Sequence, residues 1–320
     1  MDICLMIEGQ EGVTWDQWVA LARAGEQHGF EGLFRSDHYL AFARQNERGA
    51  LDPWATISAL AAVTGRIRLG TMVSPVTFRH PANLAKMVVT ADHVSGGRVE
   101  LGMGAGWFEA EHRAFGFPFP DVRERMDMLT EQVEIVHGLW GGEGDVFSFA
   151  GKHYRLDACP ALPKPYQDPH PPLIMGGGAG PRSAALAARW ADEYDVVYQD
   201  PEQSKQRMDR ISAACEAIGR DPATVRRSLL TKTIVGTDEN QVRRRATELM
   251  EWEAYAGDPD TYLADLRATH VIGTPEQVLT RLEEFAAAGI QRVLVHLLVH
   301  TDLEAVELIG REVVPEAAGL

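Results

Sequence analysis

The sequence has few cysteines and no long apolar segment. Its three cysteines, Cys4, Cys159 and Cys215, lie far apart without a Cys-x-x-Cys spacing, which argues against a disulfide framework and against a structural zinc site. No run of about 18 apolar residues occurs, so no membrane-spanning helix is expected. The first residues lack the basic region and the length of a signal peptide. We therefore expect a cytoplasmic protein that does not enter a membrane.

Positive charge is also scarce. The chain has 31 Lys and Arg residues against 46 Asp and Glu residues, a formal net charge of −15. No dense basic cluster is present, so neither a nucleic acid nor an anionic membrane is an expected partner. An anionic cofactor would have to be held by local basic groups and backbone N–H donors.

Several catalytic motifs are missing as well. The sequence has no Gly-x-x-x-x-Gly-Lys-[Ser/Thr] loop, no His-Glu-x-x-His helix and no Gly-x-Ser-x-Gly elbow. ATP use, zinc proteolysis and serine hydrolysis therefore lose support.

What is present is a regular alternation of short apolar runs with amphipathic helical patterns, typical of a parallel sheet with crossover helices. Thr14 and Gln17, for example, predict a capping box at the start of the first helix. Eight strands are predicted, at residues 3–7, 32–35, 67–72, 99–103, 173–175, 195–198, 226–235 and 292–298. This α/β pattern favours a closed (β/α)8 TIM barrel over an open sheet.

We expect a single domain over residues 1–320, because barrels of this kind commonly exceed 250 residues when they carry insertions. Three insertions interrupt the alternation. The first, about 107–121, is rich in aromatic residues and proline, and the second, about 141–171, predicts a small hairpin. The third, about 256–273, is expected to be lid-like.

The most informative stretch is the end of the second predicted strand, where an apolar run stops at Ser36, Asp37 and His38. In a β/α barrel the strand ends build the active face, so chemistry is expected there. A simpler alternative is that Asp37 caps the next element and that His38 is solvated. A metal bound by Glu8, Asp37 and His38 is conceivable, but no ligand spacing supports it, and we expect no metal.

A second candidate site is the glycine turn that follows the fifth predicted strand, Gly176-Gly177-Gly178-Ala179-Gly180. It leads into a helix, so its backbone N–H groups and the helix amino terminus could bind a phosphate, with Arg182 adding positive charge. The turn lacks the Gly-x-Gly-x-x-Gly spacing, and four strands precede it. A nicotinamide-binding Rossmann site is therefore not favoured, although Asp200 lies at about the right distance for a ribose-binding acid.

Several segments together resemble the bacterial luciferase-like superfamily, and within it the deazaflavin-dependent oxidoreductases. The similarity covers nearly the whole chain and is weaker over 140–170 and 236–272. The segments that carry it are Arg35 to His38, Gly70 to Pro81, Ser95 to Trp107, Gly176 to Gly178, and Gly273 to Val278. The resemblance implies an insertion-bearing TIM barrel of the bacterial luciferase-like type, often a homodimer. It also implies a cofactor, coenzyme F420 or alternatively FMN, with its ring in the barrel mouth.

The resemblance assigns roles to individual residues. His38 matches a histidine beside the hydride-transfer centre, and an imidazole is suited to proton transfer near neutral pH. Asp37 and Gly106 are expected near the ring, which a non-prolyl cis peptide at Met72–Val73 would support from behind. The phosphate is expected at Gly176, Gly177, Gly178 and Ala179.

The expected function is hydride transfer between coenzyme F420 and an unknown small organic substrate, assisted by His38. Two alternatives are an FMN-dependent monooxygenase that uses molecular oxygen, and a cofactor-binding protein without turnover. Trp107 stands where some sugar-phosphate dehydrogenases of the family carry a glutamate, so sugar-phosphate oxidation loses support. The sequence leaves alternative roles for two groups of nearby residues.

The first group could supply an acid or form an exposed helix face: Glu109, Glu111 and His112. The second could form an apolar substrate wall, a dimer interface or part of the core: Trp107, Phe108, Phe115, Phe117 and Phe119.

Overall fold

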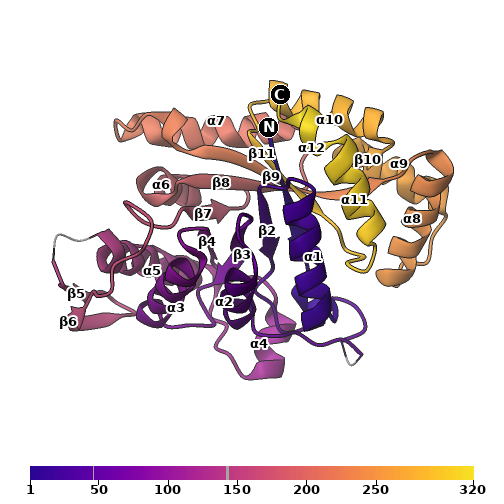
Figure 1. Ribbon diagram of the computed structural model, residues 1–320. Coiled ribbons are helices and arrows are strands. Elements are labelled where there is room, and N and C mark those ends of the chain that lie inside the picture. Colours follow the sequence, from indigo (N-terminus) through magenta and orange to yellow (C-terminus); the bar gives the residue numbers. More distant parts are fainter. Residues whose placement is uncertain (46, 142–143) are drawn as a thin grey trace.

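The computed structural model describes residues 1–45, 47–141 and 144–320 (Figure 1). All eight expected strands are present and parallel, and β1 pairs with both β2 and β11 while β8 pairs with β9. The sheet is therefore closed, which confirms the (β/α)8 barrel. The barrel strands are β1 Asp2–Ile7, β2 Gly32–Arg35, β3 Arg68–Pro75, β4 Val99–Gly104, β7 Leu173–Gly176, β8 Glu193–Val197, β9 Arg226–Val235 and β11 Arg292–His296.

Helices cover the outside of the barrel (Figure 1). The predicted capping box is present at α1, where the Gln17 side chain accepts from the Thr14 N–H at 2.8 Å. Several of the other helices begin with proline, which suits the first helical position. The helices between and after the barrel strands are α1 Trp15–Gln27, α2 Pro53–Val63, α3 Pro81–Ser95, α5 Val122–Gly141, α6 Pro181–Trp190, α7 Pro201–Ala217, α8 Glu239–Trp252, α10 Pro275–Ala287, α11 Leu303–Glu312 and α12 Val314–Ala317.

The three expected insertions all contain regular structure. Residues 107–121 include α4 Glu109–Phe115, and residues 141–171 include the expected hairpin, β5 Val146–Ala150 paired with β6 Arg155–Pro160. Residues 142 and 143 of the second insertion lie outside the described residues. Residues 256–273, expected as a lid-like segment, instead form α9 Pro259–Thr269 and β10 Val271–Gly273. The α9 helix packs its apolar face on α8, and β10 extends the sheet beside β9.

The inside of the barrel holds an apolar layer at mid-height. Phe34 occupies much of this space because small residues lie on the strands around it. A Cβ at Gly70 would come within 2.7 Å of the Phe34 ring and of the Glu100 carbonyl oxygen, so only glycine fits there. The layer also includes Cys4, Met6, Met72, Ile174, Leu230 and Leu294.

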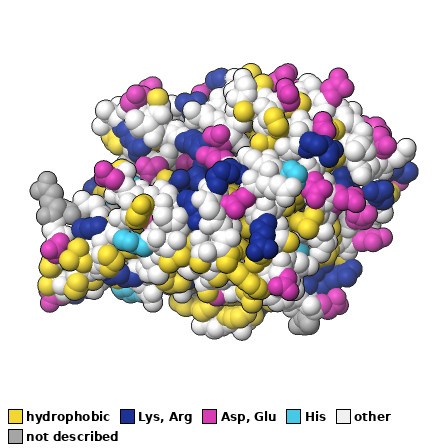
Figure 2. Space-filling model, in the orientation of Figure 1, with side chains coloured by type: hydrophobic (Ala, Val, Ile, Leu, Met, Phe, Trp, Pro, Cys, Tyr) yellow, Lys and Arg dark blue, Asp and Glu magenta, His cyan; other side chains and the backbone are white. Residues whose placement is uncertain are grey.

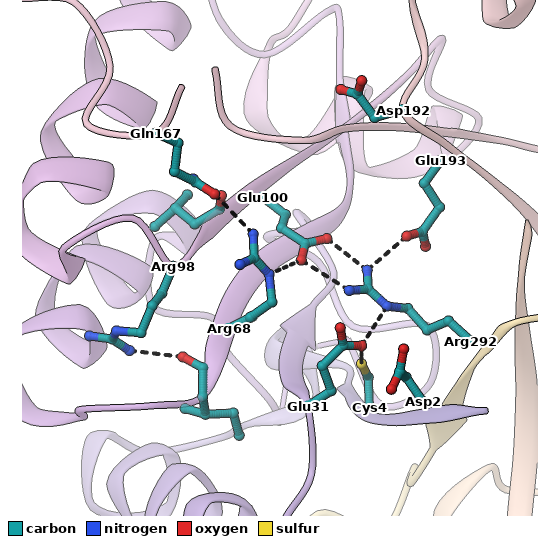
Figure 3. A network of polar contacts seen from close by, with 12 residues as sticks. Asp2, Cys4, Glu31, Arg68, Arg98, Glu100, Gln167, Asp192, Glu193 and Arg292 are labelled. Carbon is teal, nitrogen blue, oxygen red and sulfur yellow. Dashed lines mark hydrogen bonds and ion pairs between the residues drawn. The ribbon is translucent and has the colours of Figure 1, made fainter. Parts of the chain in front are cut away.

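Charged side chains fill the amino-terminal end of the barrel (Figure 3). Arg292 of β11, which is 1% exposed, lies at the centre of this network. Its guanidinium donates to Glu31 Oε2 at 2.8 Å, to Glu100 Oε2 at 2.7 Å and to Glu193 Oε2 at 2.8 Å. Arg68 pairs with Glu100 as well. One buried arginine therefore ties together three carboxylates from different sides of the barrel.

These carboxylates do not share the positive charge equally. Burial raises the pKa of a carboxyl group, but at Glu100 two arginines outweigh burial and the pKa is lowered. Glu193 pairs with Arg292, which also contacts Glu31 and Glu100. Burial, together with the charge of Glu100, therefore raises the pKa of Glu193 to about 7. Glu193 is thus the weakest ionic member of the network.

Candidate active site

The carboxyl-terminal ends of the strands surround a cavity of about 660 Å³, of the size that small-molecule sites have. In Figure 1 this mouth faces the side on which α4 lies, away from the two chain termini. Its wall comes from the ends of strands on all sides of the barrel. Among the residues that line it are Glu8, Ser36, His38, Met72, Tyr198 and His296.

The histidine and the glycine turn, far apart in the sequence, border the same cavity. Of the nine site residues that the sequence predicts, six line it: His38, Met72, Val73, Gly106, Gly176 and Gly177. The other three, Asp37, Gly178 and Ala179, are not part of its wall.

Asp37 lies behind the wall because side chains alternate at the end of β2. Ser36 and His38 point to the cavity, whereas Asp37 is fully buried on the other side. Its Oδ2 accepts from Ser74 Oγ and from Arg79 Nη1, each at 2.6 Å. Asp37 therefore connects the end of β2 to β3 and to the segment after it, and its carboxylate does not face the cavity.

His38 is held by Glu111 of α4. Glu111 Oε2 lies 2.8 Å from His38 Nδ1, and the carboxylate is fully buried. Its Oε1 accepts the backbone N–H of Tyr39 and, at 3.0 Å, that of Leu40. Because Nδ1 is occupied by this contact, Nε2 is the ring nitrogen available to a ligand in the cavity.

This contact also sets the charge of the imidazole. Burial lowers the pKa of a histidine, but the hydrogen bond and charge of Glu111, together with the charge of Glu8, outweigh burial here. The pKa of His38 is therefore raised above its ordinary value of 6.5. The same contact lowers the pKa of Glu111 against its burial, so the carboxylate stays ionised.

A second acid and histidine pair lies on the cavity wall. His296 Nε2 is 2.9 Å from Glu8 Oε1, and His296 Nδ1 is 2.6 Å from the Tyr198 hydroxyl. Burial raises the pKa of a carboxyl, but His296 and the donating Gln10 side chain reverse this and lower the pKa of Glu8 to about 2. Glu8 is therefore a fixed negative charge in the cavity.

Strand β3 carries the expected backbone feature. The peptide bond between Met72 and Val73 is cis, which confirms what the resemblance implies, and both residues line the cavity. Gly106 faces them from the end of β4 with a φ of +80°. A side chain there would be strained and would press on Pro75 and Thr77.

The glycine turn offers room and donors for a phosphate. A Cβ built on Gly177, Gly178 or Gly180 would meet nothing within 4 Å. The Gly177 N–H is used, since it donates to the Asp195 carbonyl, and the Ala179 N–H donates to the Tyr194 hydroxyl at 2.9 Å. The donors left for an anion at this turn are the Gly178 N–H and the first turn of α6, where a helix amino terminus favours negative charge.

Three arginines surround this turn, of which the sequence singled out one. Arg182 opens α6 and pairs with Asp127. Arg207 and Arg210, both on α7, donate to the carbonyl oxygens of Gly177 and Gly178 at 3.3 and 3.5 Å. Residues three positions apart are neighbours on a helix surface. The spacing of Arg207 and Arg210 could therefore have indicated a pair of positive charges on one face of α7.

Other polar residues near the mouth have different roles. Glu109 is exposed, and His112 is buried with Nε2 2.6 Å from Thr77 Oγ1, so of the three residues left open on α4 only Glu111 reaches His38. His296 was not predicted, although the period of two in β11, with Arg292, Leu294 and His296 on one side, could have placed it inside the barrel.

Within residues 1–45, 47–141 and 144–320, no group of three or more His, Cys, Asp and Glu side chains is arranged to hold a metal ion. In the same ranges no helix is both long and apolar enough to cross a bilayer.

Comparisons with known proteins agree with this geometry. The family model for luciferase-like monooxygenases matches residues 3–292. The chain belongs to the luciferase-like monooxygenase family. Among curated members, it is 34% identical over 254 residues to an F420-dependent hydroxymycolic acid dehydrogenase of Mycobacterium tuberculosis, covering 79% of this chain and 68% of that protein.

Another family member uses a flavin. The chain is 30% identical over 322 residues to an FMNH(2)-dependent dimethylsulfone monooxygenase of Pseudomonas putida, covering 92% of this chain and 86% of that protein. An F420-dependent secondary alcohol dehydrogenase, solved with an F420-acetone adduct, matches the fold with a TM-score of 0.83 and 21% identity, over 99% of this chain and 98% of that chain. This luciferase-like chain is thus an oxidoreductase whose relatives divide between two cofactors.

Proposed function

We propose that this protein is an F420-dependent oxidoreductase that transfers a hydride between coenzyme F420 and a small organic substrate. The observation that carries the proposal is the His38 imidazole, fixed through Nδ1 by buried Glu111 and facing the same cavity as the glycine turn. The F420-dependent dehydrogenase among the relatives supports the same reading.

The residues present fit such a coenzyme. Met72, Val73 and Gly106 line the cavity where its ring would lie, and the open space beside Gly178 suits its phosphate. Coenzyme F420 carries carboxylates beyond the phosphate, which FMN lacks, and the arginines at 207 and 210 place positive charge beside the turn. The chain as a whole is negatively charged, with a formal net charge of −15. Local positive charge beside the turn is therefore needed to bind an anion, and it favours the longer anionic coenzyme.

When bound, the deazaflavin supplies the hydride chemistry. In the direction of oxidation, His38 Nε2 accepts the proton that an alcohol substrate releases, and in reduction it returns that proton. Glu111 stabilises the resulting imidazolium and fixes the ring orientation. Glu8 adds a negative charge nearby, which also favours the protonated imidazole.

The direct test is an anaerobic titration of the protein with oxidised and reduced coenzyme F420. We expect binding at micromolar concentrations for both the protein and its His38→Ala variant, because His38 is not needed for the phosphate contact. Turnover of the coenzyme with an alcohol should be lost only in the variant. Binding no tighter than roughly millimolar would overturn the proposal, and full activity in His38→Ala would favour a binding protein without turnover.

An FMN-dependent monooxygenase is the second candidate, because the Pseudomonas putida relative aligns over 92% of this chain. The same cavity and glycine turn would accept FMN. Oxygen uptake with reduced FMN, dependent on an added organic substrate, would decide for this function. Oxygen uptake that yields only hydrogen peroxide, without an oxygenated product, would argue against it.

The resemblance also leads us to propose a homodimer in the cytoplasm. Sedimentation velocity over a range of protein concentrations measures the first property, and a single monomeric species at all concentrations would contradict it. Fractionation of the source cells measures the second.

A further inference from the structure

Three aromatic side chains, the exposed Phe42 and Trp107 and the half-buried Phe108, form a cluster at the mouth, which we call the aromatic rim. The Trp107 and Phe108 rings stack with centroids 5.2 Å apart, and Phe42 lies 5.4 Å from each. Trp107 is 63% exposed. Hydrophobic side chains gather along the lower edge of the view in Figure 2, over the region of α4 next to the rim. An exposed aromatic cluster beside a cavity is a candidate binding surface.

The rim is continuous with the reacting centre. Phe42 and Trp107 line the same cavity as His38. The His38 ring makes edge contacts with both of them and with Phe108, at centroid distances of 5.2, 5.7 and 6.0 Å. A substrate that donates a proton to His38 therefore has the rest of its molecule close to these aromatic rings.

The lining of the cavity away from the rim includes an ion pair as well as apolar residues. Lys232 Nζ lies 2.6 Å from Glu253 Oε1, and both residues line the cavity along with Glu8 and Tyr198. An apolar group placed on that side would remove paired charges from water without replacing their contacts, which costs free energy. An extended apolar group that avoids these charges and reaches the mouth lies on the aromatic rim.

We propose that the substrate is an alcohol, or the corresponding ketone, with an extended hydrocarbon chain that lies on the aromatic rim, and that Trp107 determines this specificity. The proposal rests on the proposed function and deepens it. In the oxidation, the C–H bond of the carbinol carbon breaks and its hydrogen leaves with the electron pair to the oxidised coenzyme. The hydroxyl proton goes to His38, and a C=O bond forms.

The test measures binding and is independent of turnover. Methyl ketones from four to ten carbons are titrated calorimetrically into the protein, with and without coenzyme F420. We expect the association constant to rise by up to about fourfold per added methylene, the factor that corresponds to about 0.8 kcal/mol per buried CH₂. In Trp107→Ala this increase should become much smaller, and Trp107→Phe should restore most of it.

Tyr166 provides a matched control, since it is an aromatic residue with 62% exposure that does not line the cavity. Tyr166→Ala should keep the wild-type dependence on chain length. An equal dependence in wild type and Trp107→Ala would overturn the proposal. So would a Trp107→Ala variant that loses coenzyme affinity or dimerisation while its dependence on chain length is unchanged, because the tryptophan would then cover the ring or a subunit interface.

The same experiment separates this proposal from the proposed function. If coenzyme F420 does not bind but the ketones show the Trp107-dependent increase, the apolar site stands and the cofactor assignment fails. If the coenzyme binds and is turned over with short alcohols but the increase is absent, the oxidoreductase stands and the hydrocarbon specificity fails.

Discussion

Glu111 Oε2 and His38 Nδ1 lie 2.8 Å apart although 73 residues separate them in the chain. The contact joins the end of β2 to a helix inside an insertion, so the insertion completes the active site. In the proposed mechanism Glu111 is a positioning residue, because it would act on the reaction through the imidazole.

Replacing Glu111 by glutamine should change the pH dependence of the reaction. Glu111 raises the pKa of His38 above 6.5, and alcohol oxidation needs the neutral imidazole, so the wild-type rate should increase as pH rises through that raised pKa. In Glu111→Gln the acidic limb of the kcat/KM profile should move to lower pH, and kcat should fall because the ring is less well oriented. His38→Ala should lower kcat by about 10²- to 10⁴-fold.

Glu109→Gln is the control for this prediction, since Glu109 is an exposed carboxylate on the same helix. It should leave both the rate and the profile unchanged. An acidic limb at the same pH in wild type and Glu111→Gln would contradict the assigned role.

Replacing Gly178 by alanine should weaken cofactor binding without loss of stability. The added Cβ meets no protein atom within 4 Å, but it would fill the space beside the Gly178 N–H where we place the phosphate. Loss of one charge-assisted hydrogen bond, about 1.5–3 kcal/mol, corresponds to a dissociation constant about ten- to a hundredfold higher. Fluorescence titration measures this. Gly65→Ala, at another glycine with open space around it, should bind as wild type does.

The arginines of α7 should discriminate between the two cofactors. The double variant Arg207→Ala/Arg210→Ala should lose affinity for coenzyme F420 by about tenfold or more, because charged contacts to its carboxylates are removed. Its affinity for FMN should fall less, since FMN ends at the phosphate. Arg189→Ala, an exposed arginine of α6 that stacks on Trp190, is the matched control. Equal losses for the two cofactors would show that the pair only holds the glycine turn.

The buried network at the other end of the barrel should respond to pH through Glu193. The pKa of Glu193 in the folded protein is raised from 4.5 to about 7, so the stability it contributes is present below pH 4.5 and is lost as pH rises through 7. Between pH 5 and pH 8 the free energy of unfolding should therefore fall less in Glu193→Gln than in wild type. The difference between the two falls should be at most about 3 kcal/mol. Urea denaturation at the two pH values measures the difference.

Glu100→Gln is the companion variant, and it should behave in the opposite way. Glu100 is ionised and paired with two arginines, so its replacement should cost about 3–5 kcal/mol at pH 8. Equal effects of the two substitutions would mean that the network does not divide its charge as described.

The sequence predicts the barrel well because each strand and helix carries its own local signal, such as the capping box at Thr14 and the apolar runs of the strands. It also places His38 and the glycine turn at strand ends, and the closed topology then brings them into one cavity. A long lid-like segment is expected from the sequence at 256–273, whereas the structure has regular elements there. The Asp258 cap and Pro259 were the local signals for the helix found there.

The sequence does not reveal which side chains meet. Glu111 lies on a seven-residue helix, too short for its pattern to show which residue is buried. The family resemblance implies that Asp37 lies near the ring, yet the alternation of side chains directs it away from the cavity. The contact between Tyr198 and His296 joins residues 98 positions apart, and no local pattern encodes such a distance.

The central place of Arg292 has a consequence for how the chain matures. The carboxylates of Glu31, Glu100 and Glu193 are all synthesised before the arginine that neutralises them, which sits on the last strand. Before β11 leaves the ribosome, Glu100 and Glu31 have only Arg68 and Arg226 as partners, and the three carboxylates lack the arginine that links them. Closure of the barrel should therefore be a late, post-translational event, and the ring of strands should assemble only when the final segment arrives.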